Sequence, residues 1–323
     1  MTGKQLALLG AKLAFSALLL WVVLNKVDVA GILARLRAAN IRWLIPGLLM
    51  GPVVVVLSAW RWHLLSLGLL GMGETIRYTW IGLFFGSILP GVVGGDLAKG
   101  VSLAAKQSRS RDPRLPISIV VDKLVGLWVL LLQFSIVAFV MLAVQPLLLT
   151  GLRGVLWLAG AATAGGLTAG IAICQPRGAA WFRKAAKRFP SAVLRSWADR
   201  ALAAIGTYEG HGSVLLAAAL LSLAIHFLNA VSFWMVMHAL AIPASIWFAA
   251  VFYPMLSVLL ALPVSVSGVG VRDVFSASIF TAFGLNPESG VAFSWLLLGL
   301  SIPNVLAGGT IQLWEVFRHH ASD

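Results

Sequence analysis

The sequence predicts an all-α polytopic membrane protein, from its composition and from the spacing of its apolar segments. The chain has 323 residues, of which 60% are hydrophobic and 11% are charged. A typical soluble domain is about 45–50% apolar and about 25% charged. A soluble fold of this size has too little interior to bury that much apolar surface. We therefore expect a single transmembrane domain over residues 1–323.

Six apolar segments are long enough to cross a bilayer, since a helical span needs about 20 residues. They cover residues 5–25, 43–67, 117–145, 152–174, 213–240 and 289–314. Two further apolar stretches, 78–104 and 245–284, are interrupted by glycine and proline around Pro90 and Pro263. Because broken backbone at membrane depth must be enclosed by protein or line a wet cavity, both stretches are predicted to be re-entrant hairpins of two half-helices.

The two halves of the chain match as an inverted repeat. Pro90 and Pro263 are 173 residues apart, and the same shift places the second span on the fifth and the third on the sixth. The halves, 1–145 and 152–314, then hold three spans and one hairpin each, and an odd number of spans inverts them. Inverted repeats with broken helices are typical of transporters. The alternative is coincidence, because any polytopic protein repeats apolar runs.

The few charged residues are mostly basic, with 24 Lys and Arg against 11 Asp and Glu and a net charge of +13. In a soluble protein this excess would suggest nucleic acid. Here the basic residues lie mainly in loops between apolar runs, where they set membrane topology. We therefore expect no nucleic-acid partner.

Charge also predicts the orientation. The basic segments 99–116 and 175–212 are expected in the cytoplasm, which places both termini on the cytoplasmic side of a bacterial-type inner membrane. Against this, four basic residues would lie outside: Lys26, Arg35, Arg37 and Arg42. An outside N-terminus, with the first hairpin crossing completely, is the alternative. The segments after the first and fourth spans mix apolar and basic residues and are expected to lie along the interface as amphipathic helices.

Each hairpin carries glycines beside charged residues. In the first, Gly94 and Gly95 allow close backbone approach to a ligand, and Asp96 and Lys99 share one helix face. In the second, Gly268 and Gly270 precede Arg272 and Asp273, and arginine is a bidentate partner for phosphate oxygens. The alternatives are a turn with a charged rim pair and an arginine that anchors a helix end.

Polar residues inside the spans are further candidates, because ionisable groups at depth are usually functional. Asp122 and Lys123 begin the third span, where Asp122 is either a functional carboxylate or the partner of a basic neighbour. Ser222, His226, Asn229 and Ser232 form one stripe on the fifth span, for head-group binding, proton relay or helix–helix bonding. Arg61 closes the second span as an interface anchor or a head-group ligand.

Signatures of an enzyme are missing. The sequence has no His-Glu-x-x-His, no Gly-x-Ser-x-Gly, no Cys/His cluster and no ATP-binding motif. The single cysteine, Cys174, excludes an internal disulfide and a cysteine zinc site. We therefore expect no catalytic residue, no metal and no cofactor, and we do not expect an enzyme.

Taken together, these motifs resemble those of a known family, the flippase-like transmembrane domain of lysylphosphatidylglycerol synthases. The residues that carry the resemblance are Leu89-Pro90…Gly94-Gly95-Asp96…Lys99, Asp122-Lys123…Gly126 and Pro263…Gly268-Val269-Gly270-Val271-Arg272-Asp273. The family pattern has Pro…Gly-Glu…Arg, then Asp-Arg…Gly, then Gly-x-Gly-x-Arg-Glu. Here Asp96 and Asp273 replace glutamate, and Lys99 and Lys123 replace arginine, so charge is kept. Ser301 lies near a place where the family often has arginine.

The resemblance implies lipid translocation across the cytoplasmic membrane by a stand-alone member without the soluble synthase domain, so lysyl transfer is not expected. Membrane lipids would be the partners, whether phospholipid, hopanoid or polyprenyl-linked. A homo-oligomer and a lipid-modifying enzyme partner remain open. Two other functions also remain open: a non-transporting partner that docks a lipid synthase or glycosyltransferase, and an intramembrane lipid transferase.

On this hypothesis the predicted site residues divide into two groups. The first group binds the lipid head group and comprises Lys99, Arg272, Arg61, Gly94, Gly95, Gly268 and Gly270. The second group orients these cations or carries a coupling proton and comprises Asp96, Asp122, Lys123, Asp273, His226 and Asn229.

Overall fold

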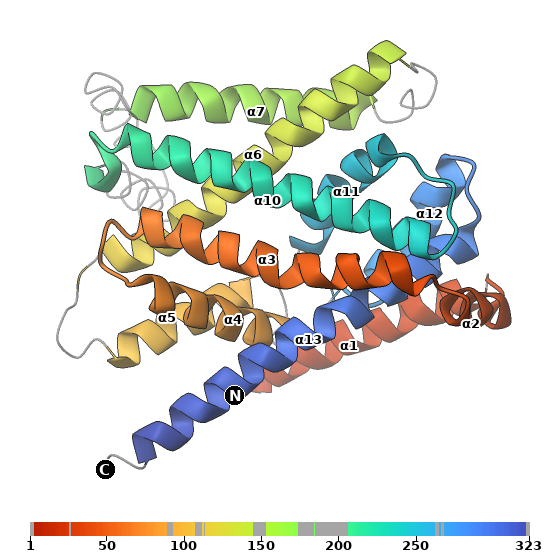
Figure 1. The fold of residues 1–323 in the computed structure, drawn as a ribbon, viewed down its shortest axis with the longest axis horizontal. Coiled ribbons are helices and arrows are strands. Elements are labelled where there is room, and N and C mark those ends of the chain that lie inside the picture. Colours follow the sequence, from red (N-terminus) through yellow and green to blue (C-terminus); the bar gives the residue numbers. More distant parts are fainter. Residues whose placement is uncertain are drawn as a thin grey trace. The chain divides into compact units, whose positions relative to one another are not determined.

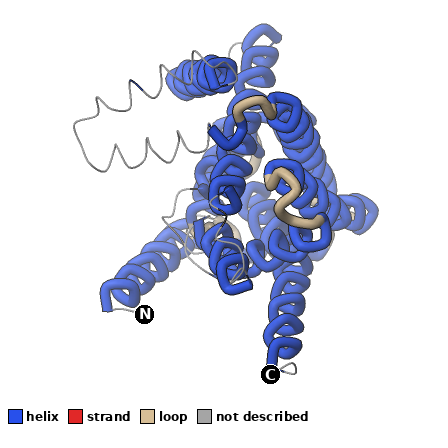
Figure 2. Tube along the Cα trace, turned by 90° about the vertical axis from the view of Figure 1, so that its left-hand side faces the viewer, coloured by secondary structure: helices blue, strands red, loops and turns tan. Residues whose placement is uncertain are grey.

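The computed structural model is helical throughout the part of the chain that it describes, and no strand occurs there (Figures 1 and 2). The described residues are 3–25, 27–88, 93–106, 112, 114–144, 153–173, 184, 206–261, 265 and 268–320. Their helices are α1 (Gly3–Leu24), α2 (Val29–Arg37), α3 (Ile41–Leu65), α4 (Met72–Ile88), α5 (Val93–Lys106), α6 (Arg114–Val144), α7 (Arg153–Ile173), α10 (Gly212–Ala239), α11 (Ile246–Ala261), α12 (Val271–Ala282) and α13 (Pro287–His320).

Four of the described helices are long and apolar enough to cross a membrane, which confirms a multi-pass membrane protein. They are Ile41–Leu65, Arg114–Leu142, Gly212–Ala239 and Pro287–Arg318. The other two predicted spans, 5–25 and 152–174, coincide with α1 and α7, and their crossing stays a prediction.

Both Pro/Gly-interrupted stretches form two helices with a break. The first break separates α4 from α5, and the second separates α11 from α12. Residues 89–92, including Pro90, and residues 262–264, including Pro263, lie outside the described residues. The re-entrant path of each pair remains a prediction.

The chain forms two compact units. Unit 1 comprises Met1–Val56, Ile76–Leu103 and Phe227–Asp323, and unit 2 comprises Leu57–Thr75 and Ala104–His226. Each unit draws residues from both predicted halves, so the units differ from the predicted repeats. The boundaries of those repeats are not tested by this division.

An aromatic core holds unit 1 together. Phe252 lies 5.6 Å from both Phe280 and Phe293, measured between ring centroids, and all three are almost completely buried. These rings come from α11, α12 and α13, so the second broken pair packs on the last helix through apolar contacts. Edge-to-face aromatic pairs of this kind add about 0.5–1.5 kcal/mol each beyond burial.

Helix α13 also holds the first broken pair. Arg77 of α4 forms an ion pair with Glu315 at 2.9 Å. One turn further along α4, Gly308 of α13 lies directly against the backbone carbonyl of Trp80, where no larger residue would fit. Both broken helix pairs of unit 1 therefore rest on α13, the second pair near its start and the first near its end, with Pro303 between them.

Unit 2 is built around α6. Trp128 of α6 packs over Gly166 of α7 and donates its indole N–H to the carbonyl of Thr163 at 3.0 Å. Tyr208, just before α10, donates its hydroxyl to the carbonyl of Leu65, the last residue of α3. Burial, and secondarily the negative charge of Asp122, raises the pKa of Tyr208, so the hydroxyl keeps its proton.

Candidate functional site

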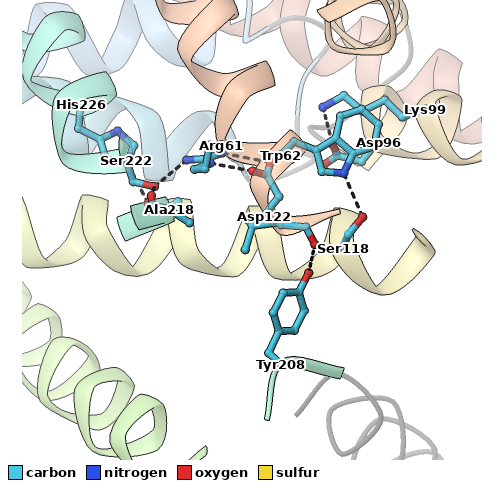
Figure 3. A network of polar contacts seen from close by, with 12 residues as sticks. Arg61, Trp62, Asp96, Lys99, Ser118, Asp122, Tyr208, Ala218, Ser222 and His226 are labelled. Atoms are coloured by element: carbon cyan, nitrogen blue, oxygen red, sulfur yellow. Dashed lines mark hydrogen bonds and ion pairs between the residues drawn. The ribbon is translucent and has the colours of Figure 1, made fainter. Parts of the chain in front are cut away.

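The first candidate site is a buried ion pair in unit 2. Arg61 of α3 donates to both carboxylate oxygens of Asp122 of α6, from Nε at 2.7 Å and from Nη2 at 3.1 Å (Figure 3). The two side chains are only 9% and 13% exposed. A bidentate pair with this little solvent contact fixes α3 against α6 at one register. Asp122 therefore has a basic partner from another span.

Two residues of α10 complete this network. Arg61 Nη1 donates to Ser222 Oγ at 2.9 Å, and Ser222 in turn donates to the carbonyl of Ala218 at 2.8 Å. His226 Nε2 lies 2.9 Å from the carbonyl of Gly126, and because a carbonyl oxygen only accepts, the histidine donates. The polar stripe of α10 thus makes helix–helix bonds at Ser222 and His226, which is one of its three predicted roles.

A glycine makes room for the arginine. A Cβ at Gly126 would lie 2.9 Å from Arg61 Nη1, so a larger residue would displace the guanidinium. Asp122 and Gly126 are one helical turn apart, and both contact Arg61, as their shared face predicts. The neighbouring Lys123 is exposed. All described hydrogen bonds of the Arg61 guanidinium go to protein side chains. This is a third role, different from the interface anchor and the head-group ligand that the sequence left open.

The second candidate site is the start of α12 in unit 1. Gly268 and Gly270 have φ of +74° and +80°, a region that favours glycine. A Cβ at Gly270 would also lie 2.7 Å from the carbonyl of Ser16 in α1. Asp273 accepts from the Gly270 N–H at 2.9 Å and from the Ser294 hydroxyl of α13. Its carboxylate therefore caps its own helix and ties that helix to α13.

Arg272 is buried at this site, with 7% of its surface exposed. Among the described residues no hydrogen bond or ion pair involves its guanidinium, and its buried Nε has no acceptor. Ser276, one turn later on the same helix face, is fully buried, and its hydroxyl also has no partner there. The carboxylate of Asp273 attracts this buried cation without a hydrogen bond among the described residues, so the Nε donor on this face of α12 is suited to an anion.

The first broken pair brings its charged residues together as the sequence predicts. Asp96 and Lys99 form an i,i+3 ion pair at 3.6 Å on α5. Gly95 lies against the carbonyl of Gly82 in α4, and a Cβ at Gly82 would lie 2.6 Å from Lys99 Cε. Gly94 lies in the first turn of α5. Gly82 and Gly95 therefore allow close contact between α4 and α5.

Asn229, the remaining predicted site residue, lies on α10 within unit 1 and is among the residues with a polar or ring interaction.

Sequence reasoning missed Ser276 and Ser294. The four-residue spacing from Arg272 could have indicated Ser276, whereas no local pattern marks Ser294. Among the described residues, no group of three or more His, Cys, Asp or Glu side chains could hold a metal ion.

Long apolar helices joined by buried charged and polar side chains define a polytopic α-helical membrane protein. The family described as "Lysylphosphatidylglycerol synthase TM region" matches residues 10–308. The chain belongs to this family, as its three motifs predict. Among curated proteins, none matches it.

Proposed function

We propose that the protein is a lipid translocase that moves a lipid head group across the cytoplasmic membrane of a bacterial-type cell. The polar head group crosses along unit 1, while the acyl chains stay in the bilayer. The proposed topology has six spans, with α4–α5 and α11–α12 as re-entrant hairpins in an inverted repeat and with both termini in the cytoplasm. Membership of the family and the two helix breaks support this arrangement.

The observation that carries the proposal is the buried guanidinium of Arg272, whose Nε has no hydrogen-bond acceptor among the described residues. The adjacent Asp273 attracts Arg272 electrostatically, but its described hydrogen bonds go to Gly270 and Ser294. An ionised side chain at membrane depth that forms no hydrogen bond with the described protein groups is a functional candidate. Arginine binds a phosphate oxygen pair with two parallel hydrogen bonds, and Ser276 is placed to donate a third.

The charged residues have different proposed roles. Arg272 and Lys99 bind the lipid phosphate, and the positive φ of Gly268 and Gly270 shapes the start of the helix that carries Arg272. Asp96 orients Lys99 through their ion pair. Asp122 holds Arg61 and is the candidate for a coupling proton. Translocation requires no covalent chemistry, so the protein acts as a carrier and not as an enzyme.

The test is lipid translocation by the purified chain in vesicles. A fluorescent phospholipid is reduced from outside by dithionite, and the fraction that remains protected reports on transport. Wild-type protein should expose the inner-leaflet lipid faster than empty vesicles do. Absence of transport for phospholipid, hopanoid and polyprenyl-linked probes would contradict the proposal, and co-purification of a stoichiometric lipid-modifying enzyme would then favour a docking role.

Replacing Arg272 tests the site. Arg272→Gln should reduce the transport rate by about ten- to a hundredfold, because a charge-assisted hydrogen bond contributes about 1.5–3 kcal/mol. Its thermal stability should be unchanged or higher, because a buried charge that forms no hydrogen bond with the described residues is removed. Arg272→Lys should retain part of the rate, and Lys184→Gln, at an exposed position, should retain all of it. A loss of stability that parallels the loss of transport would assign Arg272 to the fold instead.

A further inference from the structure

Helix α2 is fixed in place at the junction of two spans. Asp28 caps it by accepting from the Ala30 N–H at 3.0 Å, and Ile32 is fully buried in the core of unit 1. Just after the helix, the Asn40 N–H donates to the carbonyl of Ala239 at 2.8 Å. The start of α3 and the end of α10 therefore meet beside α2 (Figure 1). Because α3 and α10 are candidate spans, α2 lies at a membrane surface.

The orientation of α2 fits that position. The chain turns by 90° between α1 and α2, so α2 runs across the direction of α1. Its buried side faces α13 and the aromatic core. Its other side presents apolar residues, with Leu33 41% exposed, and the neighbouring start of α3 presents Ile41 at 65% and Ile45 at 51%. An amphipathic helix with exposed apolar residues at a surface is suited to the head-group region.

Three arginines accompany these apolar residues. Arg37 and Arg42 are exposed and Arg35 is half-buried. In the described part of the chain, no hydrogen bond or ion pair involves any of their three guanidinium groups. The one acidic residue between positions 26 and 42, Asp28, caps α2. The surface is therefore basic without a counter-charge of its own.

Membrane topology does not account for these arginines. Basic residues flank spans on one side of a membrane, the cytoplasmic side. In the proposed topology the segment 175–205, which holds seven of them, is cytoplasmic, whereas α2 follows the first span on the other side. In that topology the two basic groups lie on opposite sides of the membrane. At most one of them sets the topology.

We propose that α2 and the first turn of α3 form a binding surface for acidic phospholipid head groups, in the leaflet that the proposed topology places on the outer side. Arg35, Arg37 and Arg42 bind the phosphates, for which guanidinium groups are suited by charge and shape. Leu33 and Ile41 contact the adjoining acyl region. The apolar residues beside the arginines favour a lipid surface over an acidic protein, which would leave them in water.

The experiment uses the purified full-length chain in phosphatidylcholine vesicles that contain a photoactivatable phosphatidylglycerol. After illumination, peptide mapping by mass spectrometry locates the labelled residues. Labelling should concentrate at residues 33–45 and should fall at least about fivefold in the triple variant Arg35→Gln, Arg37→Gln, Arg42→Gln. A charge-matched variant, Arg177→Gln, Arg183→Gln, Arg188→Gln, should retain that labelling.

Two results would overturn the proposal. One is equal labelling of residues 33–45 in the wild type and the triple variant. The other is equal labelling by a photoactivatable phosphatidylcholine, which would show that the surface does not select acidic head groups. Crosslinking of this surface to a protein in native membranes, without lipid labelling, would assign it to a protein partner. Labelling does not require transport, so failure of the translocase proposal would leave this result interpretable.

Discussion

Asp122→Ala is expected to destabilise the protein by about 3–5 kcal/mol, the largest effect on stability that the structure predicts. The substitution removes both carboxylate acceptors of Arg61 and leaves a buried guanidinium with Ser222 as its remaining described acceptor. The loss of stability comes from the guanidinium of Arg61, which stays buried, with its side chain 9% exposed, after its carboxylate partner is removed. Unfolding in detergent by a denaturant titration, followed by circular dichroism, measures the loss.

Removing both charges separates the cost of an unpaired charge from the value of the pair. The double variant Arg61→Met, Asp122→Leu should recover most of the lost stability, because apolar replacements of buried ion pairs are often neutral. Asp112→Ala breaks an ion pair whose arginine, Arg114, is exposed, and it should change little. If the double variant is as unstable as Asp122→Ala, the pair itself contributes the stability and this interpretation is wrong.

Gly290→Ala and Gly299→Ala are expected to have opposite effects although both glycines lie in α13. A Cβ at Gly290 would lie 2.7 Å from the carbonyl oxygen of Ser276, a backbone atom of α12, whereas nothing lies within 4 Å at Gly299. Gly290→Ala should therefore destabilise the protein by about 1–3 kcal/mol through overpacking. Gly299→Ala should stabilise it by up to about 1 kcal/mol through helix propensity.

Gly290→Ala also bears on function. The added methyl group pushes α12 away from α13, which strains the bond from Ser294 to Asp273. Since Asp273 caps the helix that carries Arg272, the translocation rate should fall together with the thermal stability. Both quantities are measured on the same purified variants. A stable Gly290→Ala protein with wild-type transport would show that the α12–α13 contact is looser than the structure indicates.

The positions of the helices were predictable because long apolar runs have few alternatives in a membrane. The predicted spans 43–67 and 213–240 differ from α3 and α10 by one or two residues at each end. The breaks were also predictable, since proline and glycine interrupt a helix wherever they cluster. The ion pair of Asp96 with Lys99 follows from their spacing on one helix.

The partners of the other charged residues were not predictable, because pairing between helices depends on packing and not on spacing. Arg61 and Asp122 are 61 positions apart, and the sequence offered each several roles without linking them. Asp273 follows Arg272 directly, yet its described hydrogen bonds go to Gly270 and Ser294. Which arginine is hydrogen-bonded to a carboxylate can be read only from the folded chain.

Helix α13 contacts both broken helix pairs and therefore restricts how they can move relative to each other. One pair contacts it at Gly290 and Ser294, and the other contacts it at Gly308 and Glu315. As long as these contacts persist, relative movement of the pairs bends α13 between them. Pro303 lies in that interval and provides no backbone N–H, so the helix loses little hydrogen bonding by bending there. The bend would let α13 work as a hinged lever arm, in which tilting one half reorients the pair on the other.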